Sequence, residues 1–314
     1  MPRLAPPISG SNSLSIGVVA GMWERSLKAA NKAPRTVRLY LSALAYLLDH
    51  VGPTTAVNQV RRAQIEDLIA KFQEQGLQPA TISSRFRPWR TFFTWCVERE
   101  DVPLNISPMR GMDVPKVPPK LVEFPSDADV RKIIATCRKS GRHNYRGRRD
   151  EAIIRVLASS GCRLNEVTML ELEDVDLPQQ MVRVMGKGRI ERWVPIDDPA
   201  TQALSVYLKQ ERPRSPFSAS ARVWLGTKGP FTDSGIAQMY AARAKSVGVK
   251  THIHALRHRA IATMLGAGIS EGDAMAISGH RSRSMMDRYG QWSRAERARD
   301  AYRKATATGL VPKL

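Results

Sequence analysis

The sequence predicts a mainly helical protein of two domains, with a small antiparallel β-sheet in the second domain. Three observations predict this fold class. Apolar residues recur at helical spacing between residues 34 and 98, a proline-rich stretch follows at residues 105–125, and two short runs with strand character come after residue 180. The length of 314 residues is enough for two domains, each with a core of its own.

The first domain is expected to be helical and to span residues 14–112. Residues 1–13 are rich in Pro, Ser and Gly and are expected to form a flexible arm. Apolar spacing then predicts helices at residues 34–50, around residues 65–72 and at residues 80–98. Pro88 lies inside the third pattern and is expected to kink or split that helix. Phe86, Trp89 and Phe93 form an apolar stripe that favours a core position over a base-stacking platform.

The second domain is expected to span residues 126–300, after a linker at residues 113–125. Five prolines between Asn105 and Pro125 indicate the linker, and Ser126 with Asp129 resembles a capping box that opens a helix. A further helix is expected to end at Gly161. Strands are expected at 181–185 and 190–196 around a glycine-containing turn, with a third strand at 222–225. Helices are expected at 233–247, 254–267, 272–278 and from 284 onward, before a C-terminal tail at 301–314.

The charge of the chain favours a polyanionic partner. Lys and Arg number 49 against 29 Asp and Glu, which gives a formal net charge of +20. Basic side chains displace the counterions that condense on nucleic acid phosphates. The sequence contains neither an apolar run of transmembrane length nor a signal-peptide core, which favours nucleic acid over a membrane. Three scattered cysteines, without disulfide or zinc spacing, suggest a cytoplasmic, reducing setting.

Four short islands in the second domain carry residues suited to phosphodiester chemistry. Each is too short to be specific by itself. The islands are Gly161-Cys162-Arg163-Leu164-Asn165-Glu166, then Gly186-Lys187-Gly188-Arg189, then His254-Ala255-Leu256-Arg257-His258, and finally Gly279-His280 with Tyr289 nine positions on.

These residue types could break and rejoin DNA without a nucleotide cofactor. A tyrosine such as Tyr289 can attack phosphorus and keep the bond energy in a phosphotyrosine ester. Arg163 and Arg257 can balance the negative charge that gathers on the non-bridging oxygens. Lys187 can supply a proton to the leaving 5′ oxygen, and a histidine can accept the phenolic proton or order the site.

The four islands, in this order and at these spacings, resemble those of the tyrosine recombinase, or phage integrase, family, which includes the Xer recombinases. The resemblance covers about residues 126–300 and implies a site-specific DNA recombinase or integrase. It implies the following roles: Arg163, His254, Arg257 and His280 bind the scissile phosphate, Lys187 is the general acid, Glu166 supports the site, and Tyr289 forms a 3′-phosphotyrosine and frees a 5′ hydroxyl.

The resemblance also implies an architecture and partners. The first domain would correspond to the helical, SAM-like core-binding domain, and the two domains would form a clamp around double-stranded DNA. Four copies would act on two duplexes that carry specific core sites, and strands would be exchanged through a Holliday junction. No metal or nucleotide cofactor is expected. A directionality or accessory protein is a further partner that the family allows, and the C-terminal tail could pack on a neighbouring subunit.

Several readings remain open on the sequence alone. Arg259 and Met286 stand where relatives often have Thr. Lys187 could be a solvated hairpin tip, and Tyr289 an ordinary half-buried aromatic residue. His252, His254 and His258 lack the nearby Cys or carboxylate pair that would complete a zinc site. Five basic residues of the first domain are either phosphate contacts or solvated charges: Arg35, Arg38, Arg85, Arg87 and Arg90.

Two other classes of protein compete with a recombinase. A type IB topoisomerase uses similar chemistry but relaxes supercoils as a monomer. A non-catalytic DNA-binding protein could keep the fold without turnover. The two-domain layout counts against the first alternative, and the full set of candidate catalytic residues counts against the second.

Overall fold

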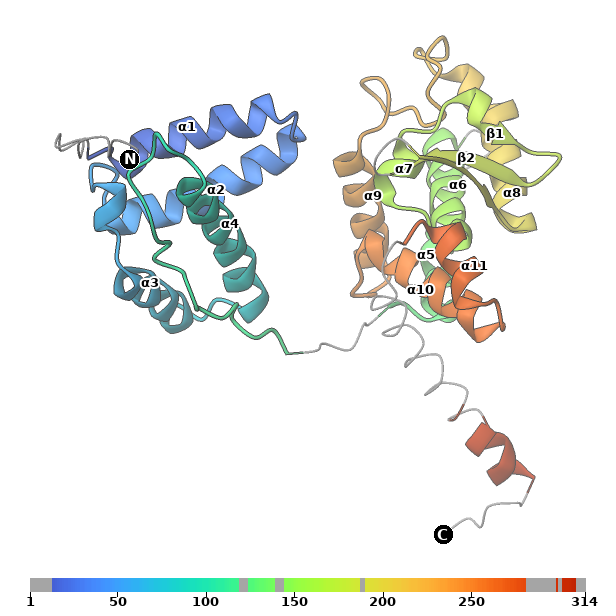
Figure 1. The fold of residues 1–314 in the computed structure, drawn as a ribbon. Coiled ribbons are helices and arrows are strands. Elements are labelled where there is room, and N and C mark those ends of the chain that lie inside the picture. The colour runs from blue at the N-terminus through green and yellow to red at the C-terminus, as the bar shows by residue number, and fades with distance from the viewer. Residues whose placement is uncertain are drawn as a thin grey trace, which may run out of the picture. The chain divides into compact units, whose positions relative to one another are not determined.

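The chain divides into two compact units in the computed structural model, Met1–Lys120 and Leu121–Leu314 (Figure 1). The structure describes residues 13–118, 124–138, 144–186, 190–280, 298 and 301–308. These residues are mostly helical, and they contain one three-stranded antiparallel sheet, in the second unit. The predicted fold class is therefore confirmed. None of the helices described is long and apolar enough to cross a membrane.

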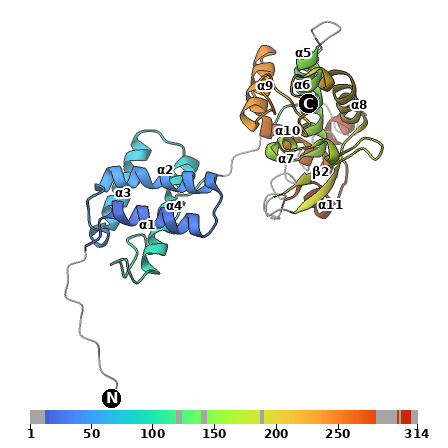
Figure 2. The same cartoon turned by 90° about the horizontal axis from the view of Figure 1, so that it is seen from above.

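The first unit is built from four helices around an aromatic core. They are α1 (Ile16–Ala29), α2 (Pro34–Val51), α3 (Arg62–Glu74) and α4 (Pro79–Val97), with a 3-10 turn at Val57–Gln59. Helix α1 lies beside α2, as both views show (Figures 1 and 2), and α2 packs on α4. Phe86, Trp89 and Phe93 are fully buried, so their predicted core position is confirmed. Trp89 donates its indole N–H to Ala43 O at 2.7 Å, which ties α4 to α2.

The sequence reading of this unit needs two corrections. Helix α1 was not predicted, although Ser15 caps it and Ile16, Val19 and Trp23 follow at helical spacing. Pro88 does not split α4, which runs unbroken from Pro79 to Val97, and the other expected outcome, a kink, stays a prediction. Proline removes one helical hydrogen bond, and the burial of Pro88 with its neighbours offsets that cost.

The second unit packs helices on one face of its sheet. Its elements are α5 (Asp127–Thr136), α6 (Tyr145–Ser160), α7 (Leu164–Thr168), β1 (Val175–Asp176), β2 (Met181–Met185), β3 (Glu191–Pro195), α8 (Asp198–Val206), α9 (Asp233–Ser246), α10 (Ile253–Gly266) and α11 (Glu271–Ser278). Shorter 3-10 and π segments lie at Leu172–Asp174 and between Tyr207 and Arg214. The predicted capping box is present, because Ser126 Oγ accepts from the Asp129 N–H at 3.2 Å. Residues 301–308 of the predicted tail are also described and are largely helical.

The sheet has the order β1-β2-β3, and all neighbours are antiparallel. Val184 pairs with Arg192, and Val182 pairs with Val194, so Arg192 shares the buried face of the sheet with these three valines. The prediction of a third strand at 222–225 is wrong, because β1 takes that place and 222–225 forms only isolated bridges. The apolar run Val223-Trp224-Leu225 is buried because it packs into the core, with Trp224 stacked on Tyr207.

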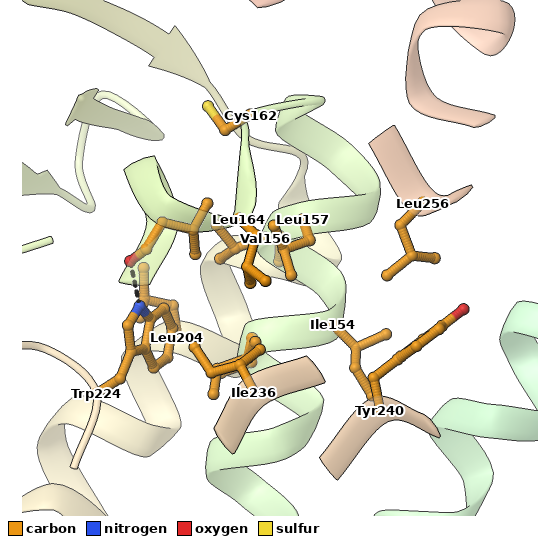
Figure 3. Close-up of a cluster of buried hydrophobic side chains, with 14 of the residues drawn as sticks. Ile154, Val156, Leu157, Cys162, Leu164, Leu204, Trp224, Ile236, Tyr240 and Leu256 are labelled. Carbon is orange, nitrogen blue, oxygen red and sulfur yellow. Dashed lines mark hydrogen bonds between the residues drawn. The ribbon is translucent and has the colours of Figure 1, made fainter. Parts of the chain in front are cut away.

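Helix α6 packs on several of the surrounding elements and contributes much of the core of this unit (Figure 3). Ile154, Val156 and Leu157 point into a cluster that also contains Leu204 of α8 and Leu256 of α10. The Trp224 indole N–H donates to Val167 O at 2.7 Å and fixes the end of α7. Helix α6 ends at Gly161, whose φ of 62° is left-handed and turns the chain into the first island.

Candidate active site

The turn after α6 fixes the first candidate arginine. Arg163 is the N-cap residue of α7, and its backbone N–H donates to Glu166 Oε2 at 2.9 Å. Its side chain reaches the same carboxylate, with Arg163 Nη1 2.8 Å from Glu166 Oε1. Arg163 and Glu166 therefore form an ion pair. The Arg163 side chain remains 39% exposed, so part of its guanidinium faces solvent.

Glu166 is a buried carboxylate held by two guanidinium groups. Besides Arg163, it accepts from Arg192, with 2.8 Å between Arg192 Nη2 and Glu166 Oε2 and 3.2 Å between Arg192 Nη1 and Glu166 Oε1. Burial acts to raise the pKa of Glu166, but the hydrogen bonds and charge of Arg192 and Arg163 outweigh it, so the pKa lies below its usual value. Glu166 is therefore ionised at neutral pH.

The second candidate arginine is buried and is held by backbone carbonyls. Arg257 lies in the first turns of α10 and is only 7% exposed. Its Nη1 donates to Gly161 O and to Ser278 O, each at 2.8 Å. Both carbonyls belong to helix ends, of α6 and α11, where the helix dipole favours a cation.

The end of α11 gathers three guanidinium groups. Arg192 Nε donates to Ile277 O at 3.0 Å, Arg257 Nη1 to Ser278 O at 2.8 Å, and Arg163 Nη2 to Gly279 O at 2.8 Å. Three successive carbonyls thus bring together side chains from α7, β3 and α10. The distances place Arg163 and Arg257 close to each other, although 94 positions separate them in the sequence.

His280 completes this cluster as a neutral ring. Desolvation, with the positive charges of Arg257 and Arg163, lowers its pKa to about 4. The Ser278 hydroxyl donates to Ala274 O at 2.6 Å, so its oxygen accepts from His280 Nδ1–H at 2.8 Å. The other ring nitrogen, Nε2, is then an acceptor, and Arg257 Nη2 lies 3.0 Å from both ring nitrogens. His280 therefore orients the Arg257 guanidinium.

The cluster carries more positive than negative charge. Three guanidinium groups face one ionised carboxylate, and the histidine beside them is neutral. Such a site suits the phosphate group of a diester, whose non-bridging oxygens carry negative charge, because guanidinium groups donate several aligned hydrogen bonds.

Comparison with known proteins assigns the family. The model of the "Phage integrase family" matches residues 125–296, more than half of the chain. The chain belongs to the phage integrase family of tyrosine recombinases. It is accordingly a tyrosine-type site-specific recombinase, as the sequence predicted.

A curated relative agrees with this assignment, and solved structures share the fold. The recombinase is 27% identical over 290 residues to "Tyrosine recombinase XerC" of Pelotomaculum thermopropionicum, and the match covers 88% of this chain and 93% of that protein. Its fold is similar to that of a lambda integrase dimer bound to a COC′ core site, with a TM-score of 0.72 and 14% identity. The match covers 89% of this chain and 78% of the integrase chain. It is also similar to a lambda integrase tetramer bound to a Holliday junction, with a TM-score of 0.69, 14% identity and coverage of 88% and 80%.

Two of the sequence-predicted residues lie outside the described part of the recombinase. These are Lys187 and Tyr289. Met286 and most of the helix expected from residue 284 onward also lie outside it. The structure does describe Gly186, the residue before Lys187, and a Cβ at Gly186 would lie 3.9 Å from Glu166 Oε1. Gly186 therefore lies beside the guanidinium cluster.

His254 and His258 lie on α10 on either side of Arg257. His254 is exposed, and His258 is half-buried with a pKa lowered by desolvation and by the neighbouring His252 and Arg257. Within the described ranges, no three His, Cys, Asp or Glu side chains are grouped as metal ligands. Arg259, where relatives often have Thr, pairs with Asp127 of α5 and so joins two helices of the recombinase.

Sequence reasoning noted Arg192 after the second island but gave it no role in the recombinase's site. The signal that could have found it is the alternation of β3, in which Arg192 and Val194 share one face. An arginine on the buried face of a strand needs hydrogen-bonding partners, because burial of an unpaired charge is costly. A buried arginine in this pattern therefore indicates a cluster of polar groups.

The five basic residues of the first unit fall into two groups. Arg35, Arg38 and Arg87 are exposed. Arg85 lies 3.7 Å from the centre of the Tyr46 ring, and Arg90 donates to Met112 O and lies over Phe86. The recombinase therefore uses Arg85 and Arg90 in its own packing, while the other three remain available to a partner.

Proposed function

We propose that this recombinase cleaves and rejoins double-stranded DNA at specific core sites through Tyr289. The phenolic oxygen would attack the scissile phosphorus, the bond to the 5′ oxygen would break, and a 3′-phosphotyrosine with a free 5′ hydroxyl would result. Rejoining would reverse these steps with the 5′ hydroxyl of a partner strand. The observation that carries the proposal is the meeting of Arg163 and Arg257 at the end of α11.

The chemistry of each residue follows from its surroundings. Arg163 would bind a non-bridging oxygen, because its described contacts use two of its five N–H donors and its side chain is 39% exposed. Arg257 would contribute a fixed positive charge, because Gly161 O and Ser278 O hold its guanidinium at 2.8 Å and His280 contacts it at 3.0 Å. Glu166 would hold Arg163 in place, and His280 would hold Arg257.

Lys187 and His254 complete the proposed set. Lys187 would protonate the leaving 5′ oxygen, a role supported by the position of Gly186 beside Glu166. His254 would bind the phosphate with the arginines, since it is exposed one helical turn before Arg257.

The assembly is proposed by analogy with the relatives. Four copies would act on two duplexes and exchange strands through a Holliday junction, as the tetrameric lambda integrase complex suggests. One domain would lie on each side of the duplex, and the C-terminal tail would pack on a neighbouring subunit. The reaction would take place in the cytoplasm, where the buried free thiols of Cys96, Cys137 and Cys162 would stay reduced.

A nicked suicide substrate tests the proposal. Genomic sites trapped by the protein supply the core sequence, and the nick lets the short 5′ fragment diffuse away after cleavage. We expect a covalent protein–DNA adduct with the wild type and none with Tyr289→Phe. Arg163→Ala and Arg257→Ala are expected to slow adduct formation by at least about 100-fold while binding is retained, because each removes positive charge from the transition state.

The same reactions separate the competing classes. Recombinant product after adduct formation supports strand exchange, whereas relaxation of supercoils without recombinant product would indicate a topoisomerase. Absence of an adduct on a verified core site would indicate a non-catalytic DNA-binding protein and would refute the proposal.

A further inference from the structure

A third arginine, Arg192, lies behind the two proposed phosphate ligands. It is on the buried face of β3, opposite Val184 of β2, and its side chain is 15% exposed. Its guanidinium contacts four separate groups: the Glu166 carboxylate, Ile277 O, Ser278 O and the Cys162 sulfur. One side chain thus joins the sheet to α7 and to the end of α11.

Most donors of Arg192 are used in hydrogen bonds within the protein. Arg192 Nε donates to Ile277 O at 3.0 Å, Nη1 to Glu166 Oε1 at 3.2 Å, and Nη2 to Glu166 Oε2 at 2.8 Å and Ser278 O at 3.2 Å. Four of the five N–H groups of a guanidinium are accounted for by these contacts. Arg163, by comparison, uses two donors and is more than twice as exposed.

The two groups that hold the Arg163 side chain both contact Arg192. The first group is Glu166, which Arg192 contacts through both carboxylate oxygens. The second group is Gly279 O, and a Cβ at Gly279 would lie 2.7 Å from Arg192 Cζ, so the glycine backbone packs directly on the guanidinium. Arg257 is linked as well, because it shares Ser278 O with Arg192.

We infer that Arg192 is a positioning residue for DNA cleavage, which fixes Glu166 and the end of α11 so that the guanidinium groups of Arg163 and Arg257 stand ready for the scissile phosphate. The inference rests on the proposed function, since that proposal makes these two arginines phosphate ligands. Arg192 itself does not touch the reacting atoms. Its effect passes through Arg163 and Arg257, which distinguishes it from a residue that only stabilises the fold.

A substrate with a neutral scissile group provides the test. In a methylphosphonate, a methyl group replaces one non-bridging oxygen, so the transition state carries one negative charge fewer and depends less on where the guanidinium groups lie. We expect Arg192→Met to slow adduct formation on the ordinary suicide substrate by at least about 30-fold. On the methylphosphonate, the ratio of wild-type to mutant rate is expected to fall to about 3 or less. Comparison within each substrate removes the intrinsic difference in reactivity.

Two control variants define what the ratio means. Arg183→Met removes an arginine of the same hairpin that pairs with Glu173 and Asp174 on the other face of the sheet, and it should leave the rate on both substrates unchanged. Lys187→Met should slow adduct formation by the same factor on both substrates, because a general acid acts on the leaving oxygen and not on the non-bridging oxygens. If the wild type forms no adduct on the ordinary substrate, the proposed function fails, and that result is distinct from any result for Arg192.

The outcomes for Arg192→Met decide the inference. An equal loss on both substrates would mean that Arg192 supports only folding or DNA geometry, and no loss on either would mean that Arg163 and Arg257 do not depend on it; each result overturns the inference. If thermal melting shows that Arg192→Met does not fold, Arg192→Lys takes its place. Its single ammonium keeps the charge near Glu166 but cannot reproduce the fork, so a loss confined to the charged substrate is again expected, and an equal loss or none overturns the inference.

Discussion

The buried guanidinium of Arg257 shows how single residues prepare this site. Burial of a charge is costly unless the charge is hydrogen-bonded and paired. Arg257 donates through Nη1 to Gly161 O and Ser278 O, two carbonyls that carry no formal charge. Its positive charge is therefore stabilised by the C-terminal ends of α6 and α11, where the helix dipole favours a cation.

His280 gives a pH prediction at this scale. Its pKa falls to about 4 from an ordinary value of 6.5, because of desolvation and the charges of Arg257 and Arg163. The unfolded chain takes up a proton near pH 6.5 that the folded chain does not take up until about pH 4. The contribution of His280 to stability is thus fully present above pH 6.5 and is lost as the pH falls from there toward 4.

Ring NMR signals of His280 test this directly. We expect no titration of the ring between pH 8 and about 5.5, and we expect urea unfolding to show a weaker loss of stability with acid in His280→Asn than in the wild type. A His280 ring that titrates near its ordinary value would contradict the neutral, Arg257-bound state.

At the scale of elements, the end of α11 is the junction on which the site depends. Gly279 has a φ of 69°, a left-handed conformation that ends the helix and presents successive carbonyls to the arginines. Two other element ends contribute arginines to this junction: β3 contributes Arg192, and the turn after α6 contributes Arg163. The site is therefore built from element ends, and the regular parts of the helices serve to hold those ends in the core.

Gly279→Ala tests the junction, with Gly268→Ala as a matched control. Both glycines have positive φ, 69° and 87°, so each alanine costs about 1 kcal/mol of unfolding free energy. A Cβ at Gly279 would also meet Arg192 Cζ at 2.7 Å, whereas nothing lies within 4 Å of a Cβ at Gly268. We expect the two variants to be destabilised, with a larger loss in Gly279→Ala, and only Gly279→Ala to lose DNA cleavage. Equal cleavage by both would contradict the role given to the end of α11.

At the scale of the whole molecule, the two units have separate cores, and the chain as a whole is strongly basic. Each unit has its own buried core, so each can hold its surface residues independently. The net charge of +20 supports strong, salt-dependent attraction to DNA. The guanidinium cluster in the second unit adds a local positive charge where the chemistry is proposed. The exposed arginines of the first unit are proposed to contact the DNA backbone.

The salt dependence of binding tests those contacts. Arg38 and Arg87 are exposed, whereas Arg99, also in the first unit, pairs with Asp101. We expect Arg38→Ala and Arg87→Ala each to lower the slope of log affinity against log salt by about 1, because each removes one phosphate contact. Arg99→Ala is expected to leave the slope unchanged. Equal slopes in all variants and the wild type would place the DNA contacts elsewhere.

The sequence by itself determined most elements and the family, because their signals are local. Helical spacing predicted α2, α3 and α4, alternation predicted β2 and β3, and the islands brought Arg163, Glu166, Arg257 and His280 to attention. The same local rules failed where packing decides: the run at 222–225 is buried without joining the sheet, and Pro88 stays inside α4.

Only the tertiary structure decided how the site is assembled. The contact of Arg163 with Gly279 spans 116 positions and that of Arg192 with Ser278 spans 86, whereas caps and helix faces relate residues three or four apart. Local rules therefore identify candidate residues but cannot show which backbone carbonyls will receive them. That choice depends on how α6, α10 and the sheet pack, and packing is a property of the folded chain as a whole.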